Sequence, residues 1–99
     1  MSNLARVNVN KVENVKTNKI YYEIDISDSY NYGSIDIEEE EIPETDIDAL
    51  QYLIDYGPDE SENITDLIDS LIEYEKGLFI NDIWYDWNEV KHLFQTNKN

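Results

Sequence analysis

The chain has 99 residues, a formal net charge of −16 and no cysteine. A chain of this length forms one domain with one modest core, so we expect a single domain over residues 1–99. The absence of cysteine excludes disulfides and thiolate metal sites. The negative charge argues against direct binding of nucleic acid, which requires a basic face. Apolar residues make up 40% of the sequence, a share that favours folding over disorder.

No apolar run reaches the length of about 20 residues that a membrane span needs. The first residues also lack the apolar segment of a signal peptide. Anionic lipid leaflets would repel a chain of this charge. We therefore expect a cytoplasmic protein of a bacterial cell, without a membrane role.

Three strands are predicted in the first part of the chain, over residues 4–15, 20–27 and 34–42. The first two form a hairpin through a turn at 16–19. The apolar phase of the first strand shifts between Val9 and Val12, which predicts a β-bulge. In the third strand, Ile35 and Ile37 face inward while the intervening acids face outward.

Two helices are predicted next, over residues 46–56 and 64–76, with an exposed linker over 58–62. The residues expected to begin and end these helices are Thr45 and Asn63 as N-caps, and Gly57, Pro58 and Gly77 as terminators.

The last part predicts a small hairpin over 78–85 and a helix over 87–95, which begins with a capping box of Asp86 and Glu89. The element order is βββααββα, an α+β fold with a small antiparallel sheet and helices packed on one face. The side chains expected in the core are Ile24, Ile37, Leu50, Leu67, Leu71 and Trp87.

The charges are segregated along the chain. Between Ile20 and Glu75 lie nineteen acidic side chains and no Lys or Arg, and all seven basic residues lie outside this stretch. A field of one sign repels itself and destabilises the compact state, so a domain usually mixes signs. The segregation indicates that the negative field binds a strongly positive partner. A halophilic protein with a generally acidic surface is the plainer alternative.

The run Glu38–Glu41 is the densest group of acids. In an extended strand the rise is about 3.3 Å per residue, close to the axial spacing of about 3.4 Å between phosphates of one DNA strand. A solvated edge strand whose charge prevents aggregation is the alternative interpretation. The candidate partner-binding residues are the acids from this region to the second helix, with two tyrosines: Asp36, Glu38, Glu39, Glu40, Glu41, Glu44, Asp46, Asp48, Tyr52, Asp55, Tyr56, Asp59, Glu60, Glu62, Asp66, Asp69 and Glu73.

Tyr52 and Tyr56 are four residues apart beside the core stripe of the first helix. They form either a packing rim or an exposed pair, which would suit an Arg-rich partner through cation–π contact.

The sequence offers no enzyme site. Its acids fall on the polar sides of the predicted elements, and the single histidine, His92, lies near the end of the last helix. A calcium loop with Gly33 at its sixth position would place Tyr30 and Tyr32 where oxygen ligands are required. We therefore expect no catalysis, no cofactor and no metal site.

Small size, strong acidity, the lack of cysteine and the acidic stretch 23–75 resemble the DNA-mimic inhibitors of phages and mobile elements. These include anti-CRISPR proteins, anti-restriction proteins and inhibitors of uracil-DNA glycosylase. The resemblance implies that carboxylates stand in for phosphates in the groove of a bacterial defence nuclease. The first target we expect is a Cas9-type effector, because its groove reads a short duplex motif with Arg side chains, and the second is a restriction enzyme. Two alternatives stay open: an acidic immunity protein that neutralises a toxin nuclease, and a regulatory module that binds a basic protein tail. We expect a monomer or homodimer.

Overall fold

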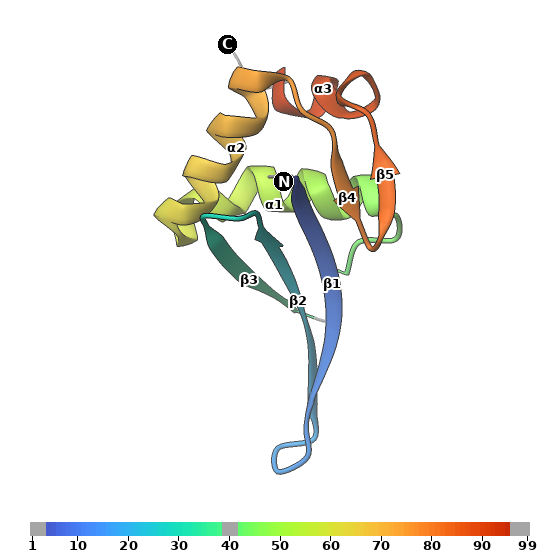
Figure 1. The fold of residues 1–99 in the computed structure, drawn as a ribbon. Helices are drawn as coiled ribbons and strands as arrows, with labels where there is room; N and C mark the ends of the chain where they lie inside the picture. Colours follow the sequence, from blue (N-terminus) through green and yellow to red (C-terminus); the bar gives the residue numbers. More distant parts are fainter. Residues whose placement is uncertain (1–3, 39–41, 96–99) are drawn as a thin grey trace.

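The computed structural model describes residues 4–38 and 42–95, without the side chain of Gln95. Within these residues the chain forms five strands and three helices in the predicted order βββααββα, which confirms the α+β fold class (Figure 1). The strands are β1 (Ala5–Asn14), β2 (Lys19–Ser27), β3 (Tyr32–Glu38), β4 (Leu78–Ile80) and β5 (Ile83–Tyr85). The helices are α1 (Asp46–Glu60), α2 (Glu62–Tyr74) and α3 (Trp87–Gln95).

The strands form one sheet in the order β3-β2-β1-β4-β5. Three of the pairings are antiparallel, but β4 lies parallel to β1, so the sheet is mixed rather than fully antiparallel as expected. The reason is the connection through α1 and α2, which carries the chain from β3 across the sheet to the far side of β1. A crossover of this kind can bring a strand in parallel, whereas a tight hairpin cannot.

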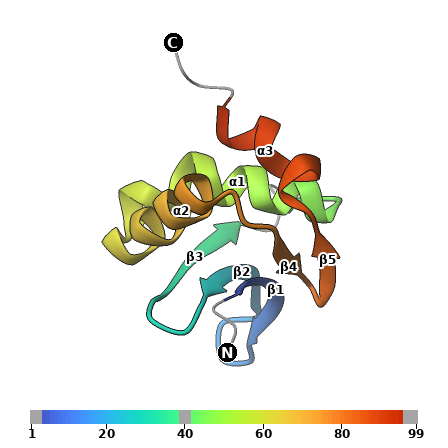
Figure 2. The same ribbon diagram turned by 45° about the horizontal axis from the view of Figure 1, so that its top comes forward.

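The helices cover one face of the sheet, and the other face is open (Figures 1 and 2). Alternate strand residues and one stripe of each helix form the core between them. Of the six side chains predicted in the core, five are buried, and Trp87 is half-buried against the ring of Phe94. The residues that alternate with the core positions point to the open face.

The β1–β2 hairpin extends beyond the helices, with its turn at the bottom of Figure 1. Its register runs without interruption from Arg6 opposite Ser27 to Asn14 opposite Lys19, so the predicted bulge is wrong. The shift in apolar phase that suggested a bulge instead reflects where these residues lie in the hairpin. Val15 lies exposed in the turn, where no helix covers the hairpin and apolar side chains need not share one face.

Helix α1 does not end at Gly57 and Pro58, as the sequence suggested, but continues to Glu60. A Cβ atom on Gly57 would lie 2.7 Å from Cγ2 of Ile64, which is buried on α2. This glycine therefore permits the close approach of two helices rather than ending one of them. The expected linker over 58–62 is absent, because only Ser61 separates the end of α1 from the start of α2.

The predicted caps have mixed outcomes. Thr45 caps α1, since its hydroxyl accepts a hydrogen bond from the Asp48 N–H at 3.1 Å. Ser61 caps α2 in place of the predicted Asn63. Glu75, in the left-handed conformation with φ of 53°, ends α2 before Gly77.

The β4–β5 hairpin and α3 form where predicted. The two turn residues, Asn81 and Asp82, both have positive φ, as a two-residue hairpin turn requires. The backbone N–H of Asp86 donates to the Glu89 carboxylate at 3.1 Å, which is one of the two hydrogen bonds of a capping box.

Candidate functional site

Acidic and tyrosyl side chains gather on the open face of β2 and β3, where core residues alternate with outward ones. The outward side chains are Tyr21, Glu23 and Asp25 of β2, with Ser34, Asp36 and Glu38 of β3. The register places Glu23 directly opposite Asp36. Two like charges in this position repel each other and weaken the strand pair. The fold therefore tolerates a local cost at this place.

The neighbouring carboxylate of Asp25 is half-buried on the same face. Burial raises the pKa of Asp25, and hydrogen bonds from Asn8 and Asn10 partly offset that rise. The amide of Asn10 donates to this carboxylate at 3.1 Å. Asp25 thus adds negative charge beside Glu23, although its surroundings disfavour the ionised form.

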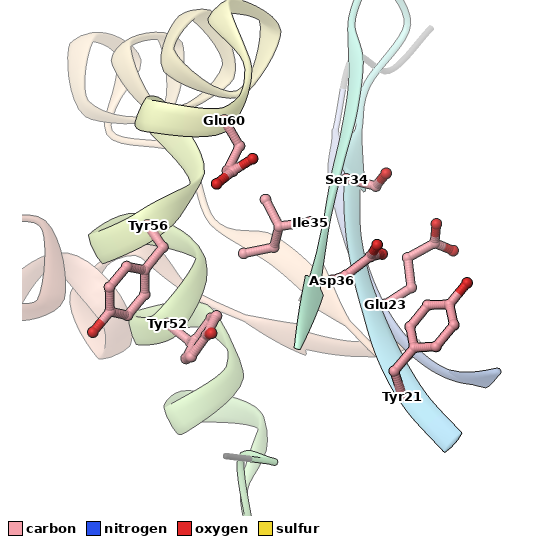
Figure 3. A pocket seen from close by; sticks show the side chains of 8 residues that line it. All are labelled: Tyr21, Glu23, Ser34, Ile35, Asp36, Tyr52, Tyr56 and Glu60. Atoms are coloured by element: carbon pink, nitrogen blue, oxygen red, sulfur yellow. The ribbon is translucent and has the colours of Figure 1, made fainter. Parts of the chain in front are cut away.

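An open depression of about 540 Å³ surrounds the edge of β3. Figure 3 shows its lining from both sides of that strand. Ile35 points toward α1, whereas Asp36 and Ser34 point to the opposite side, together with Glu23 and Tyr21 of β2. The depression is therefore not a closed pocket for a small ligand, but a surface that wraps around a strand edge.

Helix α1 supplies the other wall through Tyr52, Tyr56 and Glu60. The two rings lie 4.6 Å apart between centroids with a tilt of 47°. Tyr52 packs against the core, as a packing rim would, whereas Tyr56 is 54% exposed and lies on the surface. An exposed tyrosine among carboxylates offers a face to a cation or a guanidinium group.

The structure brings only part of the predicted set together around this edge: Asp36, Glu38, Tyr52, Tyr56 and Glu60. Exposed acids also lie along α1 and α2, in the layer on the other side of the sheet: Asp55, Asp59, Glu62, Asp66, Asp69 and Glu73. Glu44 and Asp48 are exposed at the start of α1. Glu39, Glu40 and Glu41 lie outside the described residues.

Asp46 has a different position from the other predicted acids. Its carboxylate accepts hydrogen bonds from the Tyr85 hydroxyl at 2.9 Å and from the Asn81 amide at 3.0 Å. The bond to Asp46 raises the pKa of Tyr85. This carboxylate connects the start of α1 to the β4–β5 hairpin. Asp46 therefore has a structural role and does not belong to the acidic surface around the β3 edge.

Three residues of the site were missing from the predicted set: Tyr21, Glu23 and Asp25. The signal for them was present in the hairpin. A connection at 28–31 places Glu23 opposite Asp36 and Tyr21 opposite Glu38. Alternation along the second strand places these side chains on its outward face, but it does not show which residues of the third strand they meet.

The ends of the helices carry further unfavourable charge. The C-terminal end of a helix favours cations, yet the last turns of α1 and α2 contain no basic residue. Instead, Asp59 and Glu60 end α1, and Glu73 lies in the last turn of α2. In the described part of the chain, the ion pair within 4.0 Å joins Lys11 and Glu13, at the far end of the hairpin.

Other kinds of site find little support in the described residues. No group of three or more His, Asp and Glu side chains there is arranged to hold a metal ion. None of the helices described is both long and apolar enough to cross a membrane. Comparisons with protein-family models, curated proteins and solved structures find no match to this chain.

Proposed function

We propose that this protein inhibits a bacterial defence nuclease by occupying its nucleic-acid groove, with carboxylates standing in for phosphates. The observation that supports this proposal is the opposed pair of Glu23 and Asp36, which weakens the sheet and has no cation within 4.0 Å among the described residues. A basic groove would turn this internal repulsion into a favourable contact. Charges that cost stability and have no role in the fold are typical of a surface selected for binding.

The spacing of the carboxylates suits a groove built for a charged polymer. Neighbours on one face of a strand are about 6.6 Å apart, and directly opposed residues are about 4.5–5.5 Å apart. Glu23 and Asp25 on β2, with Asp36 and Glu38 on β3, therefore form a two-dimensional array of negative charge. Phosphates of one DNA strand follow one another every ~3.4 Å along the axis, so carboxylates ~6.6 Å apart match roughly every second phosphate.

The net charge supports rapid capture of such a target. A protein of charge −16 carries a long-range field that attracts a basic groove and raises the rate of association. The attraction is screened by salt, so binding weakens as ionic strength rises. A Cas9-type effector is the first target class, since it reads a short duplex motif with Arg side chains, and a restriction enzyme is the second. Both would be met in the bacterial cytoplasm.

The test is inhibition of DNA cleavage by purified nucleases of both classes, together with competition against duplex DNA. The double variant Glu23→Lys/Asp36→Lys should inhibit roughly a hundredfold less well, as expected when buried interfacial charges are reversed. A control variant, Glu13→Lys/Asp66→Lys, has the same net charge but alters the hairpin tip and the helix layer. It should lose much less of the inhibition of DNA cleavage. A nuclease that binds its DNA and this protein at the same time would contradict the proposal.

A specific observation favours the immunity protein as a second candidate. On the open face, Cζ of the Arg6 guanidinium lies 4.4 Å from the centroid of the Phe79 ring. The centroids of the Phe79 and Trp84 rings lie 5.1 Å apart. Trp84 is 41% exposed, and Trp and Arg dominate the hot spots of protein interfaces. An immunity protein of this kind would bind beside the active site, lose affinity in Trp84→Ala, and form a ternary complex with the toxin nuclease and DNA.

A further inference from the structure

Strand β3 is an edge of the sheet, and the strand order pairs only one of its two sides. The hairpin connection indicates which backbone groups point to the free side. The Asp28 N–H donates to the Asn31 carbonyl at 3.0 Å, and antiparallel pairs alternate from there between bonded and non-bonded. Ser34 and Asp36 fall in non-bonded pairs with β2. Their N–H and C=O groups therefore point away from the sheet.

A contact from α2 supports this direction independently. The side-chain amide of Asn63 donates to the carbonyl of Tyr32 at 3.0 Å, and Tyr32 shares the alternation of Ser34 and Asp36. Ile64, the next residue of α2, packs against Gly33. The start of α2 thus covers the beginning of the edge. Past this point, among the described residues, no hydrogen bond to the outward backbone groups of Ser34 and Asp36 is found.

Beyond the part that α2 covers, negative charge is the device that limits strand pairing at this edge. From Tyr32 to Glu38 it contains no Lys and no Pro, and its register with β2 has no bulge. The carboxylates of Asp36 and Glu38 flank it instead. They disfavour a second copy of this chain, because pairing two such edges would bring like charges together. The same carboxylates favour an added strand that carries Arg or Lys.

We propose that the partner inserts an extended basic segment that pairs with β3 as an additional strand. This inference rests on the proposed function in that the partner is basic, and it adds how the partner is recognised. Backbone hydrogen bonds at Ser34 and Asp36 provide affinity, and side chains on alternate faces provide specificity. The depression around the edge leaves room for the segment on both faces of the sheet (Figure 3).

The two faces determine the pattern of the segment. Side chains opposite Asp36 lie on the open face, where Arg or Lys meets the carboxylates of Asp36 and Glu23. The alternate side chains lie on the helix side beside Ile35, next to the rings of Tyr52 and Tyr56. Apolar or aromatic residues fit there. The expected occupant therefore alternates basic with apolar residues.

The experiment measures binding of the whole protein to a short peptide in which Arg and Val alternate. Two matched peptides carry backbone N-methyl groups, one on every Arg and the other on every Val. Both have the same charge and side chains. An added strand directs only alternate N–H groups toward β3: those of Arg if it runs antiparallel, and those of Val if it runs parallel.

We expect one methylated peptide to bind roughly tenfold or more weakly than the other, because each lost peptide hydrogen bond weakens binding by about a factor of two to ten. Which peptide fails reveals the direction of the added strand. Equal affinities, whether both are retained or both lost, would overturn strand pairing. That result would leave groove occupancy standing, because the nuclease assay with Glu23→Lys/Asp36→Lys tests it separately.

Amide hydrogen exchange provides a second measurement without a variant. Binding of the unmodified peptide should slow exchange at the N–H groups of Ser34 and Asp36, which now point to solvent, and should leave Ile35 and Ile37 little changed. Unchanged exchange at Ser34 and Asp36 in the saturated complex would reject the inference. Protection of these groups in the free protein, together with a dimer in sedimentation, would show that a second copy occupies the edge, and would also reject it.

Discussion

The two ends of the sheet use their acidic residues in opposite ways. At the β4–β5 end, carboxylates are bonded: Asp46 accepts from Tyr85 and Asn81, and Asp86 accepts from the Trp84 indole at 2.7 Å. At the β3 end, carboxylates face one another across β2 and β3, and no cation lies within 4.0 Å of them among the described residues. The first arrangement stabilises the fold, and the second costs stability.

The same contrast holds for how each end is attached to the helices. The β4–β5 hairpin is connected to α1 through the polar contacts of Asp46. The β3 end is attached by packing, since Ile64 of α2 lies against both Gly33 of β3 and Gly57 of α1, and by the hydrogen bond from the Asn63 amide to the Tyr32 carbonyl. No carboxylate takes part in either contact. Apolar packing leaves the nearby carboxylates without a role in the fold. Acids with no structural role are the ones available to a partner.

The largest effect is expected from Gly57→Ala. In an ordinary helix interior this change stabilises by about 0.5–1 kcal/mol. Here the added Cβ would lie 2.7 Å from Cγ2 of Ile64, so either the Ile64 side chain or the two helices must shift. We expect a loss of about 1–3 kcal/mol in the free energy of unfolding, measured by urea denaturation.

The double variant Gly57→Ala/Ile64→Ala tests the cause of that loss. If the methyl group acts through Ile64, its cost in the Ile64→Ala background should be much smaller than in the parent. A stabilising Gly57→Ala would show that packing does not secure the β3 end, and the contrast between the two attachments would be wrong.

Gly57 also shows where prediction from the sequence stops. Apolar patterns and turn signals predicted the order of the elements. In α2, for example, the apolar side chains at 64, 67, 68 and 71 share a buried helix face. These signals failed where a residue serves a distant contact. A glycine before a proline is typical of a helix end, and nothing local shows that Ile64 occupies the space beside it.

The candidate site was predictable to a similar extent. The acidic stretch was visible in the sequence, and its outward faces followed from alternation. The opposition of Glu23 and Asp36 depends on the hairpin register, and the bonded state of Asp46 depends on a hairpin 39 residues away from it. Composition cannot distinguish an acid that holds the fold from one that weakens it, because the difference lies in tertiary partners.

The next effect comes from removing a bonded acid. Asp46→Ala should destabilise the protein by about 1–2 kcal/mol, since it removes two hydrogen bonds to an ionised acceptor. Asp48→Ala is the matched control, because it is also an acid in the first turn of α1 but is exposed. It should lose only the helix-dipole contribution of about 0.3–1 kcal/mol.

A spectroscopic readout separates this contact from a general loss of stability. The hydrogen bond to Asp46 raises the pKa of Tyr85, so the tyrosine should ionise at lower pH in Asp46→Ala than in the parent. Equal losses in the two variants, with Tyr85 unchanged, would mean that the hairpin does not depend on this carboxylate.

A smaller effect of opposite sign is expected at the other end. Asp36→Asn removes the repulsion from Glu23 and should raise the free energy of unfolding by about 0.2–1 kcal/mol, measured by urea denaturation. The control Asp66→Asn, exposed on α2, relieves the general field and the weaker repulsion from Glu62 and Asp69, one turn away on the same helix, and should gain less. The combination of higher stability and weaker nuclease inhibition in Asp36→Asn would show that this acid serves binding. Destabilisation by Asp36→Asn would instead place it among the structural acids.

The smallest effect concerns the dependence of stability on pH through Asp25. Burial raises the pKa of this carboxyl, so between its unfolded and folded pKa values the native state binds the proton more tightly than the unfolded state does. The stabilising contribution of Asp25 is therefore present at low pH and is lost as pH rises through that window, which begins near the ordinary aspartate pKa of about 3.9.

The variant Asp25→Asn removes this titration, while its amide oxygen can still accept a hydrogen bond from Asn10. The melting temperature of the variant should exceed that of the parent at pH 7, and the gap should narrow as pH falls through the window. A gap that widens on acidification would show that Asp25 is stabilised in its ionised form and belongs with the bonded acids of the opposite end.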